Sequence, residues 1–99
     1  MVTEKSVLES IKEIIDPEIG INIVDMGLIY GVDINDTTVD ITMTLTSPGC
    51  PAGGQIVNGT QHVTQQLDGV DEVNVNVVWN PRWTPEMMTE DARDELGIF

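Results

Sequence analysis

The chemistry of this 99-residue sequence centres on Cys50, the only thiol that it carries. Cys50 lies in the run Thr46-Ser47-Pro48-Gly49-Cys50-Pro51, between a strand-like alternation and a helix-like pattern. Pro48 and Gly49 favour a tight turn, and Pro51 suits the first position of a helix. Because a helix N-terminus carries about half a positive charge, it would favour the thiolate over the thiol. We therefore expect a soft-metal ligand, a sulfane-sulfur acceptor or a nucleophile; the alternative is a small buried hydrophobic side chain.

Two other residues could take part in the chemistry of Cys50. His62 follows it by 12 residues, which is ~18 Å along one helix and far beyond the ~3 Å reach of a hydrogen bond. This spacing disfavours a Cys–His hydrolase and predicts that His62 is an exposed helical residue. Thr46 could hydrogen-bond the sulfur or shape the turn, or it could be only the last outward residue of the strand.

The number of ligands limits what Cys50 can bind. An iron–sulfur cluster typically takes four protein ligands, so one cysteine cannot hold a cluster alone. A cluster would need a second chain, a carboxylate, a small thiol or a client protein to complete its coordination. A single accessible ligand suits a carrier that passes its cargo on, and we expect no tightly bound cofactor.

The composition is strongly acidic, with 17 Asp and Glu against 4 Lys and Arg and a formal net charge of −13. Such a chain repels nucleic acids and anionic membranes, so we expect neither as a partner. A hydrophobic fraction of 40% with regular periodicity argues against disorder. Scarce lysine suggests a halophilic archaeal protein in a salt-rich cytoplasm, where screening would remove the self-repulsion.

Length and motif content predict one small cytoplasmic domain that spans residues 1–99. One cysteine excludes an internal disulfide, and no Cys/His run has the spacing of a zinc site. No apolar run approaches the ~20 residues that cross a bilayer, and no secretory signal follows Met1.

The elements that would position Cys50 follow from the hydrophobic periodicity. Thr3 can cap a first helix that runs to about Ile15 and buries a one-sided apolar stripe. The members of that stripe are Val7, Leu8, Ile11, Ile14 and Ile15. The pair Asp16-Pro17 ends this helix, and residues 16–26 should form a connection that packs onto the domain. Asp16 and Glu18 in that connection have either a capping and turn role or a functional one.

Alternation predicts strands over 27–34 and 38–45, joined by a hairpin at Asn35-Asp36. The second strand should bury one face and expose the other. The buried set is Val39, Ile41, Met43 and Leu45, and the solvent-facing set is Thr38, Asp40, Thr42 and Thr44. The first strand should likewise place Leu28, Tyr30, Val32 and Ile34 on one face.

The second half of the sequence predicts another helix and another strand. The helix over 51–67 should bury Ile56, Thr60, Val63 and Leu67. The strand over 70–79 should run parallel to the strand over 38–45 and place Val73, Val75, Val77 and Trp79 on one face. The expected fold is α+β, a two-layer α/β sandwich with a small mixed three-stranded sheet and helices on one face. Its order is α-β-β-α-β, followed by short C-terminal helices.

The C-terminal tail carries most of the large side chains, which are Trp79, Trp83, Met87, Met88 and Phe99. Helix starts are predicted at Thr84-Pro85 and Thr89-Glu90, and Gly97 is expected to stop the last helix. The tail could form a flap over the sheet or the cysteine, an exposed anchor for a partner, or ordinary core packing.

Three stretches taken together resemble a known family. They are Asp16-Pro17-Glu18 with residues 23–30 (Ile-Val-Asp-Met-Gly-Leu-Ile-Tyr), Thr46-Ser47-Pro48-Gly49-Cys50-Pro51, and residues 83–93 (Trp-Thr-Pro-Glu-Met-Met-Thr-Glu-Asp-Ala-Arg) with Leu96-Gly97. In this order they resemble the SufT/PaaD-like iron–sulfur cluster assembly factors. That family includes the small subunit of the eukaryotic cytosolic iron–sulfur targeting complex.

The resemblance implies a small α+β domain, often a homodimer, that helps iron–sulfur proteins to mature. It places the site at Cys50, with Thr46 and the Asp16/Glu18 connection near it, and it implies client apoproteins and assembly factors as partners. A PaaD-like role with an oxygenase is weakened because the chain lacks the extra C-terminal cysteines of that type. Arg82 also stands where many relatives have a proline. We expect a non-enzymatic factor that presents Cys50 as a transient ligand; the alternatives are a pure adaptor and a thiol-based sulfur transferase.

Overall fold

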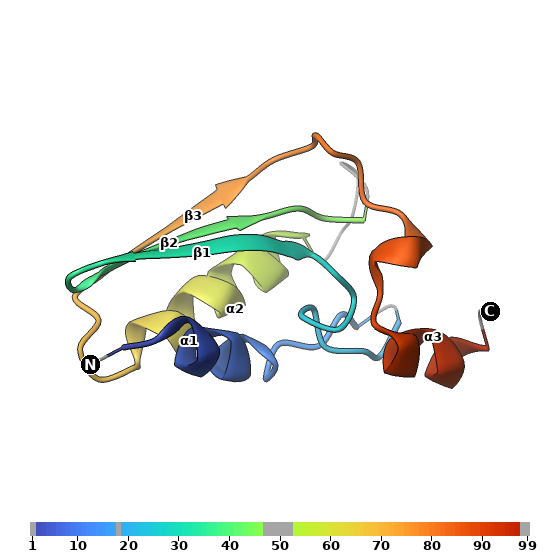
Figure 1. The fold of residues 1–99 in the computed structure, drawn as a ribbon, viewed down its shortest axis with the longest axis horizontal. Helices are drawn as coiled ribbons and strands as arrows, with labels where there is room; N and C mark the ends of the chain where they lie inside the picture. The colour runs from blue at the N-terminus through green and yellow to red at the C-terminus, as the bar shows by residue number, and fades with distance from the viewer. Residues whose placement is uncertain (1, 18, 47–52, 98–99) are drawn as a thin grey trace.

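The computed structural model describes residues 2–17, 19–46 and 53–97, and Figure 1 shows its elements as a two-layer α+β fold. The elements are, in order, α1 (Glu4–Ile11), β1 (Ile29–Asn35), β2 (Thr38–Met43), α2 (Gly53–Gln65), β3 (Glu72–Val77), the 3₁₀ helix η1 (Pro85–Met87) and α3 (Glu90–Leu96). The sheet has the order β1-β2-β3, with β1 antiparallel and β3 parallel to β2. The predicted fold class and element order are confirmed.

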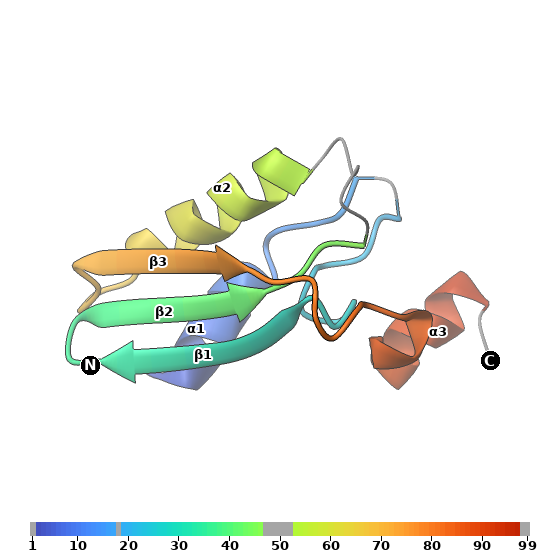
Figure 2. The same cartoon turned by 90° about the horizontal axis from the view of Figure 1, so that it is seen from above.

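Both long helices lie on one side of the sheet, as Figures 1 and 2 show from two directions. The core fills the space between these layers. Its fully buried members include Val7, Ile11, Ile23, Met26, Leu28, Val39, Ile41, Met43 and Ile56. The connection between α1 and β1 and the tail after β3 gather at the end of the sheet where β2 and β3 finish (Figure 2). No helix in the described ranges has the length and apolar character needed to cross a membrane.

Helix α1 begins as predicted but ends earlier. The Ser6 N–H donates to Thr3 Oγ1 at 3.1 Å and the Thr3 N–H donates to Ser6 Oγ at 3.0 Å, which completes a capping box. The helix ends at Ile11 instead of Ile15, and Ile15 is 50% exposed instead of buried. The helix ends early because a later segment takes the backbone groups that would continue it. The Ile23 N–H donates to the Ile14 carbonyl, and Ile15 forms a β-bridge with Asn22.

A tight turn at Asp36, with φ of +55°, joins β1 to β2. The register changes between Ile29, opposite Met43, and Gly31, opposite Thr42, so Tyr30 is the extra residue of a bulge. This bulge interrupts the predicted alternation of the first strand. It directs the Tyr30 hydroxyl to the tail.

The predicted alternation of the second strand holds as far as Met43 and then fails. Thr44 is fully buried, although the pattern had placed it on the solvent face. The strand ends at Met43, and the Thr44 N–H donates to the Leu28 carbonyl at 2.8 Å. The connection that carries Leu28 therefore covers a position that an isolated strand would expose.

Helix α2 buries a row of small polar residues against the sheet. Thr60 and Thr64 are fully buried, and each Oγ1 donates at 2.8 Å to the carbonyl four residues earlier. These bonds satisfy the two hydroxyls within the helix, which makes their burial inexpensive. The prediction had included Thr60 and Ile56 but had missed Thr64.

Candidate functional site

Two of the four predicted site residues, Cys50 and Glu18, lie outside the described residues, so their predicted roles stay predictions. The other two, Asp16 and Thr46, are described. They belong to separate segments, the α1–β1 connection and the chain that leaves β2 toward Cys50.

Asp16 occupies a tight turn of the α1–β1 connection and is only 1% exposed. Its N–H donates to the Ile21 carbonyl at 3.0 Å, and its carbonyl accepts from the N–H groups of Ile19 and Gly20 at 3.2 and 2.7 Å. Gly20 has φ of +83°, which allows the chain to reverse there. The turn role considered for Asp16 is therefore confirmed for its backbone, and its carboxyl group is held below the surface.

Thr46 is partly buried and lies three residues after β2 ends at Met43. Two bonds place this end of β2 in the fold: Thr44 N–H to Leu28 carbonyl and Val78 N–H to Met43 carbonyl, both 2.8 Å. The chain that leads to Cys50 thus departs from between the α1–β1 connection and the tail. Figure 2 shows these segments at the same end of the sheet.

A hollow of about 210 Å³ with a mixed polar and apolar lining lies beside the Asp16 turn. Its lining comes from both sides: Glu13, Ile14, Ile15 and Pro17 from the connection, and Gln55, Ile56 and Gly59 from α2. The exposed Ile15 that the periodicity had assigned to the core is part of this lining. The hollow therefore lies between the segment that precedes Glu18 and the first turns of the helix that follows Cys50.

The tail is bonded directly to the α1–β1 connection. Trp83 Nε1–H donates to the Met26 carbonyl at 2.7 Å, and the Thr89 N–H donates to the Asp25 carbonyl at 2.8 Å. The Tyr30 hydroxyl donates to the Pro81 carbonyl at 2.8 Å. Residues 80–89 thereby fix the backbone of residues 25–30, which in turn bonds to Thr44.

The large tail side chains divide between two of the roles considered for them. Met88 is 5% exposed and belongs to the core, and Trp83 is partly buried. Trp79, in contrast, is 46% exposed and lies just after β3. Core packing is confirmed for Met88, and Trp83 packs against the same core, whereas the role of Trp79 stays a prediction. Phe99 lies outside the described residues.

The sequence did not predict three features that hold the connection: the Asn22–Asp25 turn, the close approach of Gly27 to Met87 and the bond of Tyr30 to Pro81. Asn22 Nδ2–H donates to Asp25 Oδ2 and the Asp25 N–H donates to Asn22 Oδ1, each at 2.9 Å. Gly27 has φ of +80°, and a Cβ on it would lie 2.3 Å from the Met87 carbonyl oxygen. The Asn-x-x-Asp spacing signals such a turn, whereas nothing in the sequence signals the contacts of Tyr30 and Gly27 with the tail.

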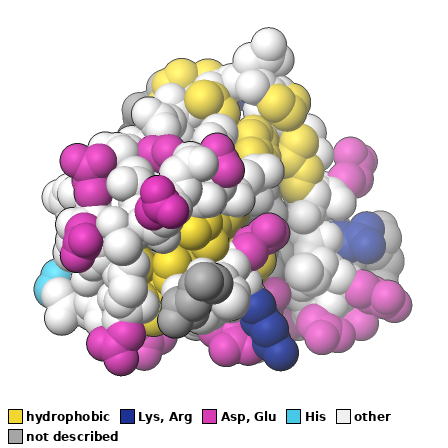
Figure 3. Space-filling model, turned by 60° about the vertical axis from the view of Figure 1, so that its left-hand side comes forward, with side chains coloured by type: hydrophobic (Ala, Val, Ile, Leu, Met, Phe, Trp, Pro, Cys, Tyr) yellow, Lys and Arg dark blue, Asp and Glu magenta, His cyan; other side chains and the backbone are white. Residues whose placement is uncertain are grey.

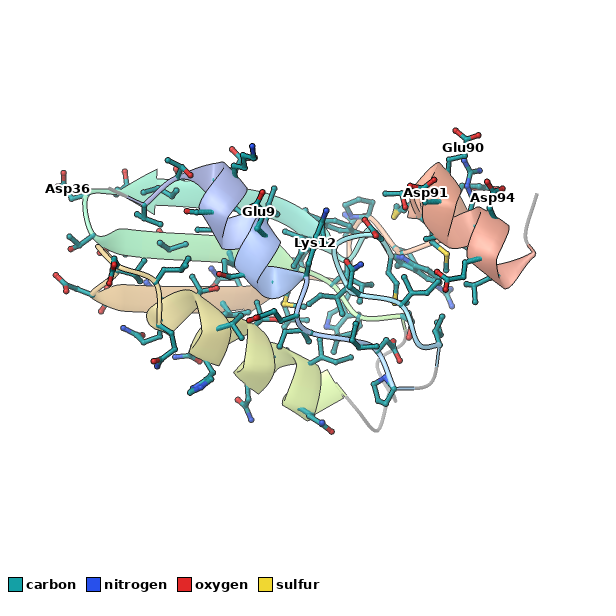
Figure 4. All side chains as sticks on the ribbon, turned by 90° about the horizontal axis from the view of Figure 1, so that it is seen from below. Glu9, Lys12, Asp36, Glu90, Asp91 and Asp94 are labelled. Carbon is teal, nitrogen blue, oxygen red and sulfur yellow. The ribbon has the colours of Figure 1, made fainter. Side chains whose placement is uncertain are left out.

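The histidine and the acidic residues that the structure describes lie apart from one another as far as metal binding is concerned. His62 is exposed on α2, as predicted. Among residues 2–17, 19–46 and 53–97, no group of three or more His, Cys, Asp or Glu is arranged to hold a metal ion. Figure 4 shows Glu90, Asp91 and Asp94 projecting outward from α3, and Figure 3 shows acidic side chains spread around hydrophobic atoms on another face.

Known proteins match this chain over most of its length. Residues 4–77 match the family described as "Iron-sulfur cluster assembly protein". The chain is 44% identical over 86 residues to the Fe-S protein maturation auxiliary factor SufT of Staphylococcus aureus, covering 86% of this chain and 98% of that protein. It is 40% identical over 98 residues to the Fe-S protein maturation auxiliary factor of Porphyromonas gingivalis, covering 98% and 93%. A solved structure of a domain of unknown function from Bacillus anthracis is 43% identical, with a TM-score of 0.91 over 97% of this chain and 92% of that chain.

Proposed function

Because this chain belongs to the iron–sulfur cluster assembly protein family, we propose that it is a non-enzymatic maturation factor that presents Cys50 as a transient ligand. The cargo would be iron or an iron–sulfur cluster on its way to a client protein. One observation carries the proposal: the chain leaves β2 for Cys50 from the end of the sheet where the connection and the tail meet. The segment that carries the Cys50 thiolate would then begin at a part of the fold that backbone hydrogen bonds hold in place.

Transient binding is supported by the supply of ligands. Cys50 is the one cysteine of the chain, and the described residues hold no three-residue metal group. A four-ligand cluster would therefore need ligands from a client, an assembly factor, a small thiol or the second chain of a homodimer. Such an incomplete site would favour transfer, because the acceptor can complete the coordination that the carrier leaves open.

The neighbours of Cys50 would have unequal roles. Burial of Asp16 supports an organising role, in which its turn orders the segment that leads to Glu18. Glu18 would be the exchangeable oxygen ligand, and Thr46 would shape the turn or donate a hydrogen bond to the sulfur. We place this work in the cytoplasm, with client apoproteins and assembly factors as partners.

A second candidate function is a pure adaptor that holds a client and leaves ligation to other proteins. The 46% exposure of Trp79 favours it, because exposed aromatic side chains are frequent anchors at protein interfaces. In that case Cys50→Ser would leave maturation intact, whereas removal of the Trp79 ring would impair it.

Cluster transfer separates these two functions. The protein is reconstituted anaerobically with iron and sulfide, separated from free iron, and mixed with a ferredoxin from which the cluster has been removed. We expect the wild-type protein to restore the ferredoxin spectrum and Cys50→Ser to restore at most about a tenth as much, because the serine hydroxyl is a poor ligand for iron in a cluster. The measurement is the visible circular dichroism of the ferredoxin.

His62→Ala is the control for this experiment, because His62 is exposed on α2 and outside the proposed site. It should transfer as the wild-type protein does. Equal transfer by wild type and Cys50→Ser would exclude the ligand role and leave the adaptor function.

A further inference from the structure

Two stretches of this acidic chain contain no charged side chain. Residues 41–67 and 73–81 have no Asp, Glu, Lys or Arg, although the chain carries 17 acidic and 4 basic residues. The first stretch includes all of α2 (Gly53–Gln65), and the second includes β3 (Glu72–Val77) after its first residue. Because α2 and β3 are in contact, the uncharged residues of these two elements form one neutral region.

Strand β3 is an edge of the sheet, paired with β2 on one side only within the described residues. The Val78 N–H donates to the Met43 carbonyl. Val78 and every second residue before it therefore direct their backbone N–H and C=O groups toward β2. Since backbone direction alternates along a strand, the N–H and C=O groups of Val73, Val75 and Val77 point away from β2. They form a row of donors and acceptors along the outer edge.

The side chains at this edge are less buried than their partners in the sheet. Val75 and Val77 are partly exposed, whereas Ile41 and Met43, opposite them in register, are fully buried. Trp79 is 46% exposed just beyond the strand. An additional strand would therefore find apolar surface beside β3, together with backbone groups that no other described strand pairs.

The other edge of the sheet is protected and β3 is not. Strand β1 carries a bulge at Tyr30 and an exposed Asp33, both of which discourage pairing with a further strand. Strand β3 has a continuous register with β2, no proline, and no charge after Glu72. A long uncharged edge that lacks these protections is a ready template for pairing.

We propose that the outer edge of β3 binds an extended segment of a partner protein as a fourth strand, with lysine or arginine beside Asp71 and Glu72. Main-chain bonds to Val75 and Val77 would supply affinity, and alternate apolar side chains would extend the core-facing surface. Charge favours a basic partner segment over a second copy of this chain. A second copy would bring another net charge of −13, whereas a segment with a basic end would be attracted to the acidic start of β3. The inference goes beyond the proposed function and does not depend on what Cys50 binds.

The test uses a dye-labelled peptide of alternating valine and threonine that ends in lysine pairs, titrated with the iron-free protein at low salt. We expect saturable binding by fluorescence anisotropy. Val75→Pro should weaken binding at least ~10-fold, because it removes an outward N–H that bonds the added strand. Proline is tolerated at such a position because no bond within the sheet is lost.

Three controls separate this proposal from its alternatives. Val75→Ala keeps the N–H and should bind within about threefold of wild type. A peptide methylated on alternate backbone nitrogens should no longer bind the wild-type protein, because it lacks the N–H groups that pair with β3. This control uses the unchanged protein and therefore remains valid even if Val75→Pro does not fold. A glutamate-ended peptide should bind at least ~10-fold more weakly than the lysine-ended one at low salt.

Equal affinity for the methylated and unmethylated peptides would overturn the proposal. Equal affinity for the lysine-ended and glutamate-ended peptides would overturn it as well. A dimer in sedimentation analysis that Val75→Pro converts to monomer would also overturn it, since the edge would then belong to a second copy.

Discussion

At the scale of single residues, the contact between Gly27 and Met87 decides how closely the tail approaches the α1–β1 connection. Gly27 has φ of +80°, and a Cβ on it would lie 2.3 Å from the Met87 carbonyl oxygen. No side chain fits there without moving the backbone of one of the two segments. The bonds of Trp83 to Met26 and of Thr89 to Asp25 depend on the same approach.

Gly27→Ala should therefore displace the tail, and Gly20→Ala is its matched control. Both glycines have positive φ, +80° and +83°, but a Cβ on Gly20 meets nothing within 4 Å. Gly20→Ala should cost about 1–2 kcal/mol of unfolding free energy from backbone strain alone. Gly27→Ala should cost about 1–3 kcal/mol more, because the clash adds to the strain.

Urea denaturation measures both losses, and hydrogen exchange at the Thr89 amide reports whether the tail has moved. Equal losses for the two variants, with unchanged exchange at Thr89, would show that the close approach does not hold the tail in solution.

At the scale of elements, hydrophobic periodicity predicted burial correctly where a helix or strand packs one face against a single neighbouring layer. Capping residues predicted the helix starts at Thr3, Thr84 and Thr89, and the handedness of a strand–helix–strand connection predicted the parallel pairing of β3 with β2. Periodicity failed for Ile15 and Thr44, where another segment takes the backbone bonds or covers the surface. Local pattern carries no information about such long-range competition.

Less of the candidate site can be compared with its prediction. The α1–β1 connection bonds to the chain just after β2 through the Leu28 carbonyl and the Thr44 N–H, whereas the approach of Asp16, Glu18 and Thr46 to Cys50 stays a prediction. The bonds from Tyr30 to Pro81 and from Trp83 to Met26 could not be predicted, because each joins residues more than fifty positions apart and follows no spacing rule. These bonds attach the tail to β1 and to the α1–β1 connection.

At the scale of the whole molecule, the dominant feature is the net charge of −13. Exposed carboxylates such as Glu90, Asp91 and Asp94 crowd α3 with few cations to offset them (Figure 4). Repulsion of this kind is screened over about 10 Å at 0.1 M salt and about 3 Å at 1 M.

The melting temperature should therefore rise from low to molar KCl. Each kcal/mol of relieved repulsion corresponds to about 4–8 °C in a domain of this size. A variant with Asp94→Asn and Glu95→Gln should show a smaller rise, because these charges also lie near the C-terminal end of the α3 dipole. Differential scanning calorimetry measures both responses, and a melting temperature independent of KCl would contradict the electrostatic account.

Ligation of iron by Cys50 is the step on which the proposed function rests, and the amount of iron bound per chain measures it. Wild type and Cys50→Ser are reconstituted anaerobically with iron and sulfide, passed through gel filtration, and assayed for iron and visible absorbance. We expect iron and a sulfur-to-iron absorption band in the wild-type protein and the loss of both in Cys50→Ser. Equal iron in the two proteins, or iron in neither, would contradict ligation by Cys50.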